Sequence, residues 1–169
     1  MTEHTRETER TRELAALQAA LRAEHAAVYG YGVVGGRIDE SRKSQVRECY
    51  EAHRTRRNAL RRSVRSLDGE PEPAAAAYAL PFAVPDSQAA VRLAAQLEDR
   101  IAGVYADLVR ASEGARRRTA AEALREAAVR SVRWKGGGVA FPGLTELGAG
   151  DSPASPSGAP TGSEAPGAL

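Results

Sequence analysis

The first long helical pattern in the chain is LAALQAALRAEHAAVYGY, residues 14–31. Its large apolar residues recur at 14, 17, 21, 28 and 31, the spacing that keeps side chains on one face of a helix. Between Leu21 and Val28 that face is continued by Glu24, with His25 beside it. Because a carboxylate rarely enters a core unless it is paired or bound to a metal, Glu24 is the first candidate for a functional residue.

The composition favours an all-α protein. The 169 residues are enough for one domain with a hydrophobic core and a tail. Ala, Leu, Glu and Arg dominate, and aromatic residues make up only 5%, which favours helix and leaves little material for a sheet.

Charge and cysteine content indicate the compartment. The 24 basic and 22 acidic residues nearly balance, so the whole chain is not a polyelectrolyte built to hold nucleic acid. A charged N-terminus and the lack of any long apolar stretch predict neither a signal peptide nor a membrane span. The single cysteine, Cys49, agrees with a reducing compartment, so we expect a cytoplasmic protein with no membrane partner.

Four helices are predicted from periodicity and capping residues. The first begins near Thr8 or Thr11 and ends at Gly35-Gly36. Asp39 is a candidate N-cap for the second helix, and Asp86-Ser87 for the third. The fourth runs over about 115–134, and the glycines at 136–138 are interpreted as its stop. The inner face of the second helix is expected to consist of Val46, Tyr50, His53, Leu60, Val64 and Leu67.

The connection at 68–85 determines the topology. Its four prolines exclude a continuous helix. At up to about 3.4 Å per residue it can span roughly 55 Å, whereas a helix of about 26 residues is only about 39 Å long. It can therefore travel the full height of a bundle. We predict two antiparallel hairpins joined by one long crossover, an up-down, ferritin-like four-helix bundle.

The expected domain covers residues 1–147, with its core at about 12–144. Residues 139–144 carry apolar side chains and should fold back over the bundle. Of the 22 residues at 148–169, 13 are Gly, Pro or Ser, which predicts a disordered tail.

A metal site is one interpretation of the buried polar residues. A di-metal carboxylate centre takes a Glu from each of two helices and a Glu-x-x-His pair from each of the other two. Here Tyr50 stands where that Glu would precede His53, and the fourth helix has no histidine, while its Glu122 and Glu126 are expected to face water. A reduced iron or manganese site would therefore use Glu24, His25, His53 and Glu98.

The interpretation we favour is a buried polar cluster without catalysis. In it, Glu24 is hydrogen-bonded to His53, Tyr50 or an arginine. No catalytic or cofactor-binding residue is predicted, no small-molecule substrate is indicated, and whether the chain is an enzyme stays open. Cys49 is expected to be a small core side chain.

A basic second helix offers a third possibility. Nine Arg or Lys lie between residues 41 and 68, which could contact nucleic-acid phosphates. They are spread around the helix, however, and no aromatic residues interleave with them to stack on bases. We interpret them, and the arginines at 116–118, as a solvated face, and do not expect nucleic acid as a partner.

Four runs of residues carry a family resemblance: LRAEHAAVYGYGV at 21–33, YEAHRTRRNAL at 50–60, ALPF at 79–82, and Trp134 followed by FPGL at 141–144. Together they cover about 12–144. The chain resembles a family of uncharacterised ferritin-like domain proteins from high-GC bacteria. That resemblance implies a ferritin-like bundle without the complete di-iron pattern, and it implies no particular activity.

Three hypotheses follow. The first is a non-catalytic module, assembled as a homodimer or larger oligomer. The second is a metal-binding oxidoreductase or storage protein, and the third a nucleic-acid accessory protein. We favour the first.

Overall fold

The computed structural model describes residues 3–136 and contains four long helices. No strand occurs in this range, which confirms the predicted all-α four-helix bundle. None of these helices is both long and apolar enough to cross a membrane. The helical elements are α1 (Glu3–Gly35), a 3-10 turn η1 (Glu40–Arg42), α2 (Lys43–Arg65), α3 (Ser87–Ala111) and α4 (Gly114–Lys135).

The helix ends differ from prediction at the start of α1 and α2. The Thr8 and Thr11 hydroxyls, expected near the N-cap, instead donate to the carbonyls of the residues four positions earlier, His4 and Glu7, at 2.9 Å. This bonding occurs inside a helix, so α1 begins earlier, at Glu3. Asp39 precedes the η1 turn rather than α2, and its side chain makes no cap hydrogen bond.

Two further predicted ends, the start of α3 and the end of α4, are confirmed. The Asp86 carboxylate accepts from the backbone N–H of Ala89 at 2.8 Å and caps α3. Gly136 ends α4 in the left-handed region at φ 75°, where a glycine costs least.

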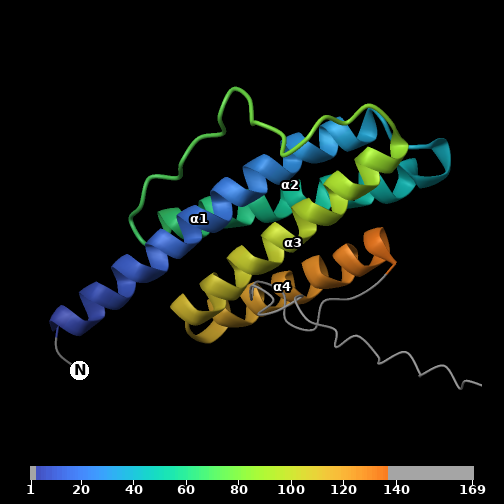
Figure 1. Ribbon diagram of the computed structural model, residues 1–169. Helices are drawn as coiled ribbons and strands as arrows, with labels where there is room; N and C mark the ends of the chain where they lie inside the picture. The colour runs from blue at the N-terminus through green and yellow to red at the C-terminus, as the bar shows by residue number, and fades with distance from the viewer. Residues whose placement is uncertain (1–2, 137–169) are drawn as a thin grey trace, which may run out of the picture.

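The helices pack as two hairpins, α1 with α2 and α3 with α4, which contact each other through α1 and α3 (Figure 1). Within the described range, α1 packs on α2 and α3, and α3 packs on α4. In contrast, no Cα atoms of α2 and α4 in this part of the chain lie within 8 Å of each other. The fourth side of the bundle is therefore closed by long side chains rather than by close backbone packing.

The crossover runs along α1 (Figure 1). The Gln18 amide donates to the Glu70 carbonyl at 2.6 Å and accepts from the Glu72 N–H at 3.1 Å. The Tyr29 and Tyr78 rings meet with centroids 5.5 Å apart. Gln18 and Tyr29 lie on one face of α1, so this face fixes the crossover to the bundle surface.

The apolar core forms two clusters. One contains Leu17, Leu21, Leu60 and Leu108, and the other Val34, Val46, Leu93 and Trp134. On α2 and α3 the buried polar residues lie between the positions that contribute to the two clusters. The predicted fold-back of 139–144 and the disordered tail at 148–169 lie outside the described residues, so the domain boundary at 147 stays a prediction.

Replacing the cap of α3 tests its contribution. Asp86→Ala removes the acceptor for the Ala89 N–H and should lower the free energy of unfolding by about 1 kcal/mol, measured by urea denaturation. Asp39→Ala is the matched control, because Asp39 occupies an N-cap position without a side-chain hydrogen bond. Equal losses in both variants would contradict a specific role for the Asp86 side chain.

Candidate functional site

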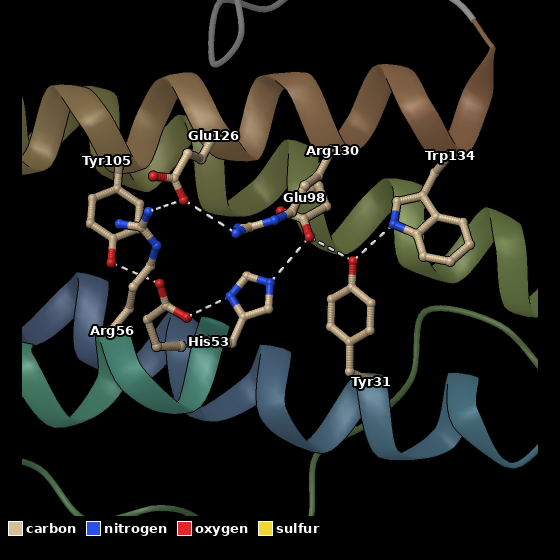
Figure 2. Close-up of polar contacts among 9 residues, drawn as sticks. Tyr31, His53, Arg56, Glu98, Tyr105, Glu126, Arg130 and Trp134 are labelled. Carbon is tan, nitrogen blue, oxygen red and sulfur yellow. Dashed lines mark hydrogen bonds and ion pairs between the residues drawn. The ribbon is translucent and has the colours of Figure 1, made fainter. Parts of the chain in front are cut away.

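Three buried residues from three helices form the centre of the bundle. Glu24 of α1, His53 of α2 and Glu98 of α3 are each 0% exposed. His53 Nδ1 lies 2.7 Å from Glu24 Oε2, and Nε2 lies 3.1 Å from Glu98 Oε1 (Figure 2). Because a carboxylate faces each ring nitrogen, the arrangement fits an imidazolium that donates at both nitrogens. The predicted burial of Glu24 is confirmed, and of the three partners left open for it, His53, Tyr50 or an arginine, the structure shows His53.

Two tyrosines donate further hydrogen bonds to the two carboxylates in a reciprocal pattern. The Tyr105 hydroxyl, on α3, donates to Glu24 Oε1 on α1 at 2.7 Å. The Tyr31 hydroxyl, on α1, donates to Glu98 Oε1 on α3 at 2.6 Å. Each tyrosine follows the glutamate of its own helix by seven residues and bonds the glutamate of the facing helix. Tyr105, not Tyr50, is therefore the hydroxyl partner of Glu24.

Trp134 ties α4 to this network. Its indole N–H donates to the Tyr31 hydroxyl at 3.0 Å, and the Tyr31 ring stacks on His53 with centroids 5.2 Å apart (Figure 2). A continuous chain of hydrogen bonds thus runs from Trp134 to Tyr105 and passes through side chains of all four helices.

Arginines from α2 and α4 lie beside the centre. Arg56 and Arg130 both donate to Glu126 Oε2, Arg130 at 3.2 Å (Figure 2). Burial alone would raise the pKa of Glu126, but these guanidinium groups outweigh it and lower that pKa. Glu126 was predicted to face water; it is instead half-buried as the link between α2 and α4. Glu122 is exposed, as predicted.

The charges in this layer balance. Glu24, Glu98 and Glu126 contribute three negative charges when ionised. The guanidinium groups of Arg56 and Arg130 contribute two positive charges, and a protonated His53 contributes the third. Burial would lower the pKa of His53, but its hydrogen bonds to Glu24 and Glu98, together with their charges, raise that pKa to about 9.

The two buried tyrosines and the cysteine of the core stay neutral at pH 7. Burial, and next the charge of a neighbouring carboxylate, raises the pKa of both Tyr31 and Tyr105. Burial also raises the pKa of the Cys49 thiol, which is 3% exposed. Cys49 is thus a buried, protonated thiol, as predicted for a core side chain.

His25 lies apart from the centre. Its Nε2 is 3.2 Å from the Glu72 carbonyl, so the ring contacts the crossover rather than the carboxylates. Burial lowers the pKa of His25, which favours the neutral ring. Of the four predicted metal ligands, the structure therefore brings together Glu24, His53 and Glu98 but not His25.

The geometry at His53 bears on the metal hypothesis. Its two ring nitrogens point at different carboxylates, so a shared ion would require the ring to turn and give up one hydrogen bond. Over residues 3–136, no group of three His, Cys, Asp or Glu side chains is arranged to hold a metal ion. Glu98 Oε2 is buried and has no hydrogen-bond partner among the described residues, so it retains capacity for a further ligand.

Sequence reasoning missed both tyrosines, Trp134 and the two arginines as parts of the site. A signal for the tyrosines was present. Glu24 precedes Tyr31 and Glu98 precedes Tyr105 by the same seven residues, which is two helical turns and places each pair on one face. Arg56 and Arg130 carried no such signal, because they resemble the many exposed arginines around them.

Some of the basic residues of η1 and α2 are engaged in contacts with other side chains. Arg42 lies over the Trp134 ring at 4.3 Å, Lys43 pairs with Glu40, and Arg54 pairs with Glu51. Arg47, Arg61, Arg62 and Arg65 are exposed. These paired and solvated cations fit the solvated face expected from the sequence, whereas Arg56, whose side chain is 17% exposed and paired with Glu126, contradicts that expectation.

Stability should fall as the pH rises through the pKa of His53. That pKa is about 9 in the folded chain, against the ordinary value of 6.5. The stabilisation is therefore fully present below about pH 6.5 and is lost as the pH approaches and passes 9. Urea unfolding between pH 6 and 10 should show a loss on the order of 3 kcal/mol. A flat profile, or the same loss in His53→Gln, would contradict this assignment.

The two histidines should differ in their effect on stability. His53→Ala leaves two buried carboxylates without their cation and should cost about 3–5 kcal/mol. His25→Ala removes one hydrogen bond to a backbone carbonyl and should cost about 1 kcal/mol. Thermal and urea denaturation of both variants measures the difference, and equal losses would contradict the separate placement of the two rings.

Comparisons with known proteins are consistent with this fold. A crystal structure of the conserved hypothetical protein rv2844 from Mycobacterium tuberculosis is similar, with 34% identity and a TM-score of 0.72, covering 73% of this chain and 95% of that chain. Comparison with curated proteins gives no match. Residues 16–146 match the family described as a domain of unknown function, DUF4439. This match spans most of the sequence, and the chain therefore belongs to the DUF4439 family.

Proposed function

We propose that this chain is a non-catalytic helical module of ferritin-like type, in which Glu24, His53 and Glu98 determine how the helices assemble. The observation that carries this proposal is the use of both His53 ring nitrogens by two buried carboxylates. Both oxygens of Glu24 are also engaged, one by His53 and one by Tyr105. A catalytic centre needs an open position for its substrate, and these contacts leave none at His53 or Glu24.

The charge balance supports the same proposal. In carboxylate bundles that hold two metal ions, the ions neutralise the buried glutamates. Here protonated His53, Arg56 and Arg130 supply the positive charge from the chain itself. The order of the helices and the long crossover support the ferritin-like topology. Because cationic side chains take the role that metal ions have in such bundles, the charge balance favours a structural centre.

A reduced iron or manganese site is the second candidate. The environment of Glu98 Oε2 supports this candidate. This buried oxygen has no hydrogen-bond partner among the described residues and could bind an ion or a water molecule. Glu24 and a turned His53 could then complete a mixed carboxylate and imidazole ligand set. An oxidoreductase or a storage protein would need such a site.

The remaining expectations concern partners and location. The homodimer and the cytoplasmic location expected from the sequence stay predictions. The exposed arginines of α2 are the surface that a nucleic-acid accessory protein would use, but their spread around the helix and their local pairs do not favour that role.

Metal content separates the two candidates. We expect the untagged protein, purified from its native host, to contain far less than about one iron, manganese or zinc ion per chain. Added Fe²⁺, Mn²⁺ or Zn²⁺ should leave its melting temperature unchanged, since a ligand that binds only the folded state would raise it. Elemental analysis and thermal denaturation provide these measurements.

Three variants decide the interpretation of any metal found. Stoichiometric metal that is lost in Glu24→Gln and Glu98→Gln but retained in His25→Gln would overturn the non-catalytic proposal and establish the reduced site. Metal that is retained in all three variants would be bound elsewhere on the chain and would leave the buried centre as proposed.

A further inference from the structure

A groove of about 630 Å³ lies between α1, α3 and the crossover, away from the charged centre. Its floor is lined on one side by Ala23, Ala26 and Ala27 of α1 and on the other by Leu97 and Ile101 of α3. The crossover residues from Tyr78 to Pro81 also line the groove. Its volume lies within the range of small-molecule pockets in proteins, which is roughly 300–1,000 Å³.

The two helices approach closely at one point along this groove. A Cβ atom at Gly30 would lie 2.6 Å from Leu97 Cδ1, so α1 and α3 are in tight contact there. At Ala23, Ala26 and Ala27 the small side chains leave open the space that larger residues would fill. The floor is therefore apolar and can accommodate an aliphatic chain.

The charges in the lining are all positive. Its charged residues are Arg22 and Arg100, and it contains no acidic side chain. Arg22 is already paired with Glu72 at 2.5 Å. Arg100, on the opposite wall, is exposed and makes no hydrogen bond or ion pair with any residue between 3 and 136. The groove thus combines an apolar floor with one uncompensated guanidinium group.

We propose that this groove binds a free fatty acid, with its carboxylate on Arg100 and its aliphatic chain along the floor between α1 and α3. A guanidinium group binds a carboxylate through two parallel charge-assisted hydrogen bonds. One uncompensated positive charge matches a monoanion. The site is separate from the His53 centre, so this proposal does not depend on the function proposed above and adds a ligand to the module.

Displacement of a fluorescent amphiphile tests the proposal. The full-length chain is loaded with 1-anilinonaphthalene-8-sulfonate and titrated with sodium dodecanoate below its micelle-forming concentration. Dodecanoate should displace the dye, and dodecyltrimethylammonium, which has the same chain length and the opposite charge, should compete about tenfold less well.

Three variants test whether the ligand occupies the groove. Arg100→Gln should weaken dodecanoate binding about tenfold, whereas Arg118→Gln, which removes an exposed arginine of α4 outside the groove, should leave it unchanged. Ala26→Trp fills the floor and should abolish binding. Circular dichroism and the melting temperature verify that each variant is folded.

Several results would overturn the proposal. These are no displacement by dodecanoate, equal affinity in Arg100→Gln and the unaltered protein, or equal competition by the cationic amphiphile. Binding to vesicles of phosphatidylglycerol without any binding of free dodecanoate would also overturn it, and would indicate a membrane surface as the ligand.

Discussion

The structure depends on one buried contact, the His53 imidazole held between the carboxylates of Glu24 and Glu98. Placing two carboxylates in a protein interior is costly unless a cation and hydrogen bonds compensate them. The imidazolium does this for both carboxylates at once, because its two donors point in opposite directions. Since the three residues belong to α1, α2 and α3, this contact fixes the positions of these three helices along the bundle axis relative to one another.

The reciprocal tyrosines extend the same constraint. α1 and α3 each carry a glutamate and, two turns later, a tyrosine, and each tyrosine bonds the glutamate of the other helix. A shift of one helix along the other by one turn would break both bonds, so the pair specifies the register of the interface. The fourth helix is joined by Trp134 and by the link from Arg56 through Glu126 to Arg130. These long side chains bridge the α2 and α4 surfaces, whose backbones do not pack closely.

Much of this architecture could be predicted from the sequence. The apolar periodicity was sufficient to predict the four helices. The prolines of the crossover and the short turns were sufficient to predict how the helices pair. Glu24 was identified because it interrupts an apolar face. The rest depended on tertiary contacts: His25, adjacent to Glu24 in sequence, contacts the crossover, because neighbouring residues on a helix point about 100° apart. Glu126 lies off the apolar face of its helix, so the sequence predicted that it would face water. Its arginine partners, however, come from α2 and from the next turn of α4.

The protonation state of His53 tests the central claim most directly. ¹⁵N NMR of the protein labelled at histidine, recorded at pH 7.5, reports the proton occupancy of each ring nitrogen. The structure predicts that both nitrogens of His53 carry a proton, that their signals are protected from solvent exchange, and that they titrate near pH 9. One unprotonated ring nitrogen at this pH would contradict the carboxylate–imidazolium centre. A signal shifted by a bound metal ion would instead support the reduced metal site.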